Sequence, residues 1–217
     1  IGGIDVERTL EAGRPVAAPG LLAAAHGGVL YVDEINLLAP ELANVLCHTL
    51  ASGQVRIERE GISQTSPAEF VLIGTFNPAE GPVAPALLDR AAFITPVTTL
   101  RDVPTRAFIA ANAGRPLALP PDVINMVEVG REVLPQVYMP ANALKELCAA
   151  ATALQALSNR AEVFAVRCAK ANAALNARVP ITQSDIDLAV RLVLSPRATH
   201  RMEIVKAGAD QSPSETP

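Results

Sequence analysis

The chain has 217 residues, a formal net charge of −4 and a hydrophobic fraction of 50%, but an aromatic fraction of only 3%. This length is enough for one large domain or two small ones. The acidic balance argues against a protein that binds nucleic acid through a basic surface. No run of about 18 uncharged apolar residues occurs, which argues against a transmembrane helix.

The three cysteines, Cys47, Cys148 and Cys168, are scattered and odd in number. Their spacing is that of neither a disulfide framework nor a metal site, so the sequence indicates a reducing interior. The three histidines also lack the spacing of metal ligands. A metal centre built from His or Cys is therefore not predicted.

The first half of the chain alternates short apolar runs with helical patterns. The apolar runs over 29–32 and 70–75 predict buried strands. The pattern over 37–50 predicts a helix that Gly53 ends. Residues 55–59 alternate apolar and charged side chains, which predicts a half-exposed strand and a hairpin. Strands separated by helices are typical of a parallel α/β sheet.

The second half of the chain is different, because only helical patterns follow one another there. Helices are expected over 121–132, 141–157, 160–176 and 184–194. For the last of them, Thr182 or Ser184 is the expected cap. Asp185 and Asp187 suit the positive end of the same helix.

These patterns predict an α/β domain over 1–113 and a helical domain over 114–199. The composition of 200–217 is polar and rich in proline, which is typical of a linker. The chain begins without an initiator Met, within what reads as a folded segment, so we expect further domain sequence upstream.

The sharpest chemical signal is the pair Asp33 and Glu34, directly after the apolar run 29–32. In open α/β sheets, ligands bind beyond the carboxyl ends of the strands. An aspartate there suits Mg²⁺, and a neighbouring glutamate suits the activation of a water molecule. The alternative interpretation is an ordinary strand followed by an acidic helix start.

Two further polar residues follow in chain order. Asn77 comes just after the second apolar run, and its amide is expected beside Asp33 and Glu34. The alternative is that Asn77 and Pro78 simply start a turn. Arg90 ends a short helical pattern, where its planar fork suits the phosphate of a neighbouring subunit. The alternative is an exposed arginine that pairs with an acid.

Taken in chain order, these features resemble the AAA+ ATPases, in the branch with a hairpin before the sensor-1 strand. More closely, the chain is similar to the AAA+ subunits of magnesium chelatase. The resemblance runs from about Gly2 to Arg197. The stretches that carry it are PGLLA at 19–23, GVLYVDEINLL at 28–38, EREGIS at 58–63, NPAEG at 77–81 and LLDR at 87–90.

The resemblance implies an α/β AAA+ module, with a parallel αβα sheet and a pre-sensor hairpin, followed by an all-α helical lid domain. It implies ATP and Mg²⁺ as cofactors. Asp33 is then the ligand of the Mg²⁺ of Mg-ATP, and Glu34 polarises the attacking water. Asn77 is sensor 1, Arg90 is the finger offered to a neighbouring subunit, and Arg160 is sensor 2.

By the same resemblance the chain is a D-type subunit of magnesium chelatase, a ligase complex of chlorophyll or bacteriochlorophyll biosynthesis. Such a subunit forms a hexameric ring platform with the I-type ATPase. The ring drives ATP-dependent insertion of Mg²⁺ into protoporphyrin IX on a separate H-type subunit. The expected location is the cytoplasm, or the plastid stroma in a plant or alga.

Three stretches favour the D-type over the I-type. Residues 91–93 are Ala-Ala-Phe, where I-type chains usually have Phe-Gly directly after the LLDR sequence. The stretches 159–167 and 192–198 are similar to the lid of D-type chains, and the tail is similar to the start of their acidic linker. The alternatives are an I-type motor, a MoxR-like ATPase and a subunit of a cobalt chelatase.

One departure from the family concerns the phosphate-binding loop. The pattern G-x-x-x-x-G-K-[ST] does not occur in these residues, and the pairs at 2–3 and 27–28 lack the lysine and the spacing. The resemblance places that loop upstream of Ile1. Whether this chain itself hydrolyses ATP is therefore open on the sequence alone.

Overall fold

The computed structural model describes residues 2–59, 62–116, 118–156 and 158–198. The predicted linker over 200–217 lies outside the described residues. By its contacts the chain divides into two compact units, Ile1–Ala91 and Ala92–Pro217. The domain boundary expected after residue 113 stays a prediction. Each unit is described by itself.

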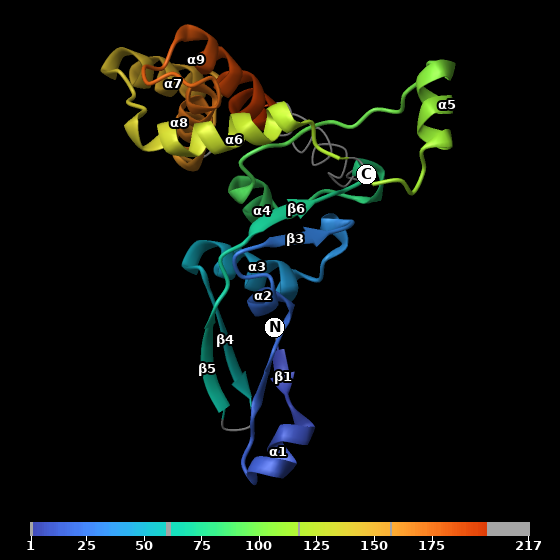
Figure 1. Ribbon diagram of the computed structural model, residues 1–217. Coiled ribbons are helices and arrows are strands. Elements are labelled where there is room, and N and C mark those ends of the chain that lie inside the picture. Colours follow the sequence, from blue (N-terminus) through green and yellow to red (C-terminus); the bar gives the residue numbers. More distant parts are fainter. Residues whose placement is uncertain (1, 60–61, 117, 157, 199–217) are drawn as a thin grey trace, which may run out of the picture. The chain divides into compact units, whose positions relative to one another are not determined.

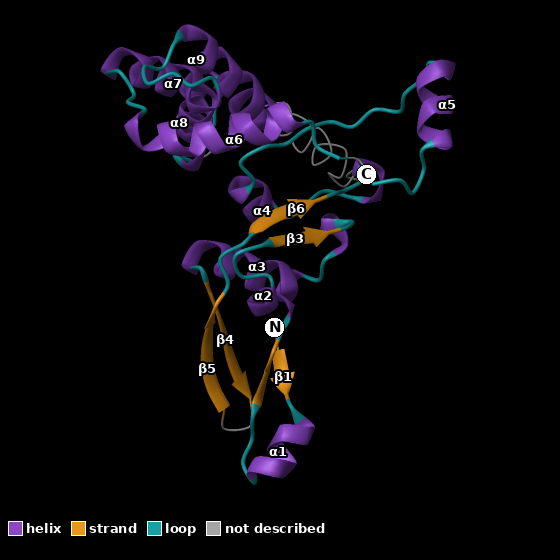
Figure 2. Cartoon of the chain, in the orientation of Figure 1, coloured by secondary structure: helices purple, strands orange, loops and turns teal. Residues whose placement is uncertain are grey.

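The first unit is mixed α/β, as expected, and Figures 1 and 2 show its elements. The strands among its described residues form three two-stranded sheets. The elements in chain order are β1 (Gly2–Ile4), α1 (Val6–Ala12), β2 (Ala17–Pro19), α2 (Leu21–Ala24), β3 (Val29–Val32), a 3₁₀ turn (Ile35–Leu37), α3 (Pro40–Ser52), β4 (Gln54–Arg59), β5 (Ile62–Pro67), β6 (Val71–Gly74), a 3₁₀ turn (Pro78–Glu80) and α4 (Pro85–Arg90).

The parallel pairing expected of this unit is confirmed. β3 and β6 are parallel neighbours, with Val29 opposite Val71 and Val32 opposite Gly74. Leu30 and Leu72 pack on a cluster that includes buried residues of α3 and α4. One face of the strand pair is therefore covered by helices.

The prediction that these strands are buried is wrong for their other face. Val29, Tyr31 and Val71 are each about 60% exposed, at 59%, 59% and 61%. The physical reason is the pleat, which turns alternate side chains to opposite faces. Within the described residues only one face of this two-stranded sheet is packed against helices, so alternate apolar residues face solvent.

The helix expected over 37–50 is observed, but it begins later, at Pro40. Proline has no N–H to donate and a fixed φ, so it fits the first helical position and not the interior. The chain before it forms the 3₁₀ turn Ile35–Leu37. Gly53 caps the end of α3 in the left-handed conformation, with φ of 68°, as expected.

The predicted hairpin is confirmed. β4 and β5 pair in antiparallel register, with Val55 opposite Ser66 and Ile57 opposite Gln64. Val55 and Ile57 are buried, whereas the charged residues between and after them, Arg56 and Glu58, are exposed. The alternation in the sequence thus corresponds to the two faces of the hairpin.

The second unit contains helices, as expected. Their bounds are α5 (Val103–Ala111), α6 (Pro121–Val133), a 3₁₀ turn (Leu134–Gln136), α7 (Ala141–Ala153), α8 (Arg160–Leu175), α9 (Gln183–Ala189) and a π-helical turn (Val190–Leu194). The helix expected over 141–157 ends earlier, at Ala153. The helix expected over 184–194 continues past Ala189 as the π-helical turn.

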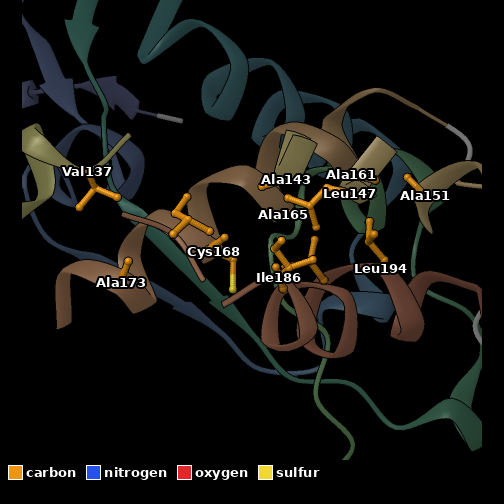
Figure 3. Close-up of a cluster of buried hydrophobic side chains, with 14 of the residues drawn as sticks. Val137, Ala143, Leu147, Ala151, Ala161, Ala165, Cys168, Ala173, Ile186 and Leu194 are labelled. Atoms are coloured by element: carbon orange, nitrogen blue, oxygen red, sulfur yellow. The ribbon is translucent and has the colours of Figure 1, made fainter. Parts of the chain in front are cut away.

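The core of this unit is built largely from small residues, and Figure 3 shows a part of it. Ala151, Ala165 and Ala189 are fully buried, and so are the larger Leu147 and Val193. Small side chains allow the helices to approach closely, and the larger residues fill the space that remains. Cys168 lies in this core, and Cys47 is buried in the first unit, whereas Cys148 is exposed.

An ion pair between a buried carboxylate and a partly exposed arginine lies at the start of α9. Thr182 is the N-cap, and its backbone N–H donates a hydrogen bond to the carboxylate of Asp185 at 2.8 Å. The carboxylate also accepts both Nη1 and Nη2 of Arg178, at 2.7 and 2.8 Å, and Nδ2 of Asn172 at 2.6 Å. The sequence indicated only a favourable position on the helix dipole, and it missed the distant partners.

No helix among the described residues is long and apolar enough to span a membrane.

Candidate functional site

The parallel pairing of β3 and β6 brings two polar residues to one edge of the sheet. Val32 lies opposite Gly74, so the next residue on each strand, Asp33 and Thr75, lie side by side beyond the strand ends. The backbone N–H of Thr75 donates to the carbonyl of Val32 at 3.1 Å, which closes this edge. The edge is the place where open α/β sheets bind ligands.

Asp33 is held by two hydroxyl groups. Oδ1 accepts the hydroxyl of Thr75 through a short hydrogen bond and the phenolic hydroxyl of Tyr31 at 3.1 Å. The hydrogen bond from Thr75, followed by that from Tyr31, holds the pKa of the exposed Asp33 carboxyl below its usual range. The carboxylate is therefore ionised at neutral pH and accessible to a cation.

Glu34 is exposed and has a left-handed backbone, with φ and ψ both at 50°. This region is uncommon for residues other than glycine, asparagine and aspartate. The N–H of Glu34 donates to Oγ1 of Thr75 at 3.2 Å, and the N–H of Ile35 donates to the carbonyl of Thr75 at 2.9 Å. The acidic pair thus lies on a turn that is hydrogen-bonded to Thr75, the residue directly after β6.

Asn77 follows Thr75 by two residues, but its amide bonds within its own turn. Oδ1 accepts the N–H of Ala79 at 3.1 Å, and Nδ2 donates to Oε1 of Glu80 at 3.3 Å. This is the local turn that the sequence offered as the alternative interpretation. The role of Asn77 as sensor 1 stays a prediction.

Arg90 is the last residue of α4 and is partly buried. Its Nη1 donates to the carbonyl of Ala86 at 2.9 Å, one turn back on the same helix. Its Nε is buried, and no hydrogen-bond partner for it exists in the part of the chain that the structure describes. The guanidinium of Arg90 is thus hydrogen-bonded to its own helix through one nitrogen, Nη1.

Arg160 is the first residue of α8 and is exposed. It belongs to the second unit, whereas the other predicted site residues belong to the first. Its role as sensor 2 stays a prediction.

The residues at the sheet edge fit Mg-ATP in their donor chemistry. Mg²⁺ is usually bound by one or two carboxylates, with waters and phosphate oxygens completing its shell. Asp33 supplies one ionised carboxylate with oxygen donors, and Glu34 lies next to it in the chain. Over the described ranges no group of three or more His, Cys, Asp or Glu gathers to hold a metal by itself.

Sequence reasoning missed Thr75 and Asn36 as residues of this edge. In the sequence Thr75 is only the end of an apolar run. Parallel pairing of the runs 29–32 and 70–75 is the signal that places Thr75 beside Asp33. Asn36 donates through Nδ2 to the carbonyl of Gly81 at 3.3 Å, across a separation of 45 residues. Nothing local in the sequence indicates that contact.

Comparisons with known proteins show which families and which fold the chain is similar to. Residues 6–90 match the family of magnesium chelatase, subunit ChlI, and residues 144–216 match the AAA lid domain. A crystal structure of a predicted ATPase from Cytophaga hutchinsonii superposes with a TM-score of 0.68, covering 98% of this chain and 72% of that chain. The two share 18% sequence identity, so this likeness shows the fold alone.

Two relatives represent two kinds of chelatase subunit. The magnesium-chelatase 67 kDa subunit of Chlorobaculum tepidum is 39% identical over 94% of this chain and 34% of its own length. The magnesium-chelatase 38 kDa subunit of Rhodobacter capsulatus is 35% identical over 91% of this chain and 59% of its own length. The chain thus spans about a third of the first relative and about three fifths of the second. The chain has the fold of an AAA+ ATPase, with a parallel sheet and a helical lid, and it is similar over most of its length to AAA+ subunits of magnesium chelatase.

Proposed function

We propose that this chain is the AAA+ part of a D-type magnesium-chelatase subunit, which binds Mg-ATP at the edge formed by Asp33 and Glu34. The observation that carries the proposal is the exposed, ionised carboxylate of Asp33 at the paired ends of β3 and β6. Residues 6–90, which contain this edge, match the magnesium-chelatase family, and residues 144–216 match the AAA lid domain. Both matches support the same proposal.

The chain's own residues would divide the work at this edge. Asp33 offers a carboxylate oxygen to Mg²⁺, and Glu34 takes the proton of the attacking water. Bound Mg-ATP supplies a phosphoanhydride bond whose hydrolysis releases the energy for metal insertion. Asn77 would orient the water or the terminal phosphate, and Arg160 keeps its predicted role as sensor 2.

Arg90 would act on a neighbouring subunit. It lies at the end of α4 with one nitrogen bound to Ala86 and a buried Nε that lacks a partner within the described residues. The planar guanidinium of an arginine suits a phosphate, which it can bind through two parallel hydrogen bonds. This supports a finger that completes the neighbour's nucleotide site in a ring.

The D-type assignment rests on similarity. The 67 kDa relative is 39% identical to this chain and the 38 kDa relative is 35% identical. The stretch Ala91–Phe93 and the stretch 192–198 favour the same assignment. Partners would then be an I-type ATPase in a hexameric ring and an H-type porphyrin subunit, and the product would be magnesium protoporphyrin IX.

The test is ATP turnover by the full-length protein, alone and mixed with its I-type partner. We expect the protein alone to be inactive, and we expect Arg90→Ala to lower turnover of the mixture at least tenfold, because a finger contributes a factor of about 10³ or more. Arg14→Ala, which removes an exposed arginine of the same unit, is the matched control and should leave turnover unchanged.

The second candidate is an I-type motor, which the 38 kDa relative favours. In that case the protein alone turns over ATP, and Glu34→Gln abolishes the activity whereas Glu11→Gln does not. That outcome would contradict the D-type assignment. Insertion of Co²⁺ in place of Mg²⁺, measured with the complete complex, would contradict the proposed metal.

A further inference from the structure

Thr75 contacts the acidic turn through all three of its polar groups. Its N–H donates to the carbonyl of Val32, and its carbonyl accepts the N–H of Ile35 at 2.9 Å. Between these two backbone bonds its hydroxyl donates to Asp33 and accepts the N–H of Glu34 at 3.2 Å. Thr75, the residue directly after β6, thus contacts the whole segment from the end of β3 to the start of the 3₁₀ turn.

The hydroxyl performs a task that the two backbone bonds of Thr75 do not. Glu34 is in the left-handed conformation, which costs free energy for a residue with a Cβ and persists only where the surroundings hold it. The N–H of Glu34 is directed to Oγ1 of Thr75. The same oxygen is tied to Asp33, so one hydroxyl fixes both acids relative to each other.

An apolar contact closes the turn on its other side. Ile35 is buried, and a Cβ added to Gly74 would lie 3.0 Å from its Cδ1 and 3.3 Å from its Cγ2. Ile35 therefore packs directly on the backbone of β6, one residue before Thr75. This contact holds the turn against β6. The hydrogen bond to the hydroxyl of Thr75 then stabilises the left-handed conformation of Glu34.

We propose that Thr75 is a positioning residue, whose hydroxyl holds Glu34 in its left-handed conformation beside Asp33 and so sets the direction of both carboxylates. Its consequence for ATP turnover rests on the proposed function, but the positioning itself does not. A side chain that only stabilised the sheet would act through its volume, and valine would replace it. A positioning hydroxyl is replaced by serine and not by valine.

The first measurement is hydrogen exchange at the Glu34 amide in the full-length protein without nucleotide, resolved by fragmentation of its peptides. Thr75→Val should accelerate exchange about fivefold, the change expected for the loss of one ordinary hydrogen bond. Thr75→Ser should restore it to within twofold. Unchanged exchange in Thr75→Val would overturn the proposal.

Two controls are needed. One tests whether losing a hydrogen bond to Asp33 alone affects the Glu34 amide, and the other tests the effect of a threonine-to-valine change elsewhere in the unit. Tyr31→Phe removes the other hydroxyl on Asp33 but no contact with Glu34, so exchange at Glu34 should stay within twofold of wild type. Thr65→Val makes the same change on an exposed residue of β5 and should also have no effect at Glu34. An equal acceleration in Tyr31→Phe would overturn the assignment to Thr75.

The second measurement is ATP turnover of the same variants in the mixture with the I-type partner. We expect Thr75→Val to lower kcat with little change in KM, and Thr75→Ser to restore kcat. If exchange at Glu34 accelerates but turnover is unchanged in every mixture, the positioning role is supported and the proposed catalytic function of Glu34 is contradicted. The two failures are thus distinguishable.

Discussion

The two units bury their apolar residues in different ways. In the helical unit, Leu147 and Val193 have no exposed surface. In the α/β unit, Val29 and Val71 on the paired strands are 59% and 61% exposed. The helices of the second unit bury its core on all sides, whereas within the described residues helices cover only one face of the strand pair β3 and β6.

This difference matches what each unit presents to other molecules. Asp33 is the predicted Mg²⁺ ligand, and Glu34 is the predicted water-activating residue. Both lie at the exposed end of a sheet with one packed face, and both are held by hydrogen bonds. The buried charge of the helical unit, Asp185, is fully enclosed by partners. The accessible carboxylate of Asp33 can bind a ligand, whereas the enclosed carboxylate of Asp185 stabilises the fold.

The largest effect is expected for Asp185→Ala in the helical unit. The change leaves Arg178, Asn172 and the N-cap without their shared acceptor. The side chain of Arg178 is 32% exposed, so we expect a cost of about 3 kcal/mol, that of lost hydrogen bonds to a charged group. Hydrogen exchange of the α8 amides in the full-length protein would report this loss. Asp187→Ala removes an exposed aspartate of the same helix and should cost little. Equal effects would contradict the importance of this ion pair.

The same pair predicts a pH dependence. Burial alone would raise the pKa of Asp185, but hydrogen bonds from Arg178, Thr182 and Asn172 outweigh it and hold the pKa well below its usual range. A depressed pKa contributes stability above the unfolded value of about 4, and the contribution is lost as the pH falls below that value. Stability of the α8 amides should therefore decline below about pH 4 in wild type, and less steeply in Asp185→Ala.

A matched pair of substitutions tests the comparison directly. Val193→Ala removes buried methyl groups and should cost about 2 kcal/mol. Val71→Ala makes the same change on the exposed face and should cost less than about 0.5 kcal/mol. Urea unfolding of the 217-residue chain, followed separately for each unit by hydrogen exchange, measures both. Similar costs would mean that the open face is covered in solution.

Gly74→Ala tests the close contact between β6 and Ile35 at the candidate site. The added Cβ would lie 3.0 Å from Ile35 Cδ1, so Ile35 must shift and the α/β unit should lose about 1 kcal/mol. Gly3→Ala is the control, because a Cβ there meets no atom within 4 Å. Thermal unfolding of both variants gives the comparison, and equal midpoints would show that Ile35 does not press on β6.

The smallest effect is expected for the exposed ion pair of the hairpin. Arg56 Nη2 lies 2.5 Å from Glu58 Oε1, but both side chains are more than 60% exposed, at 63% and 62%. Surface pairs of this kind contribute little because solvent screens them. Arg56→Ala should leave the thermal midpoint unchanged, and a clear drop would show that the hairpin is packed against something in solution.

Sequence patterns predicted the type of the longer elements between residues 29 and 75 and after residue 120, but they gave no prediction for β1, α1, β2, α2 and α5. The strands at 29–32 and 70–75, the hairpin after Gly53 and the helices after 120 are all observed with small changes at their ends. Those changes have local causes, such as Pro40 at the start of α3. The roles of Glu34, Asn77, Arg90 and Arg160 stay predictions.

What the sequence by itself determined is the set of periodic patterns and the position of Asp33 and Glu34 at a strand end, because periodicity and turn chemistry act between near neighbours. Only the tertiary structure decided which distant residues complete them. Thr75 meets Glu34 across 41 residues, and Asn36 meets Gly81 across 45. Such contacts depend on strand register, and register is a property of the paired chain segments and not of either segment alone.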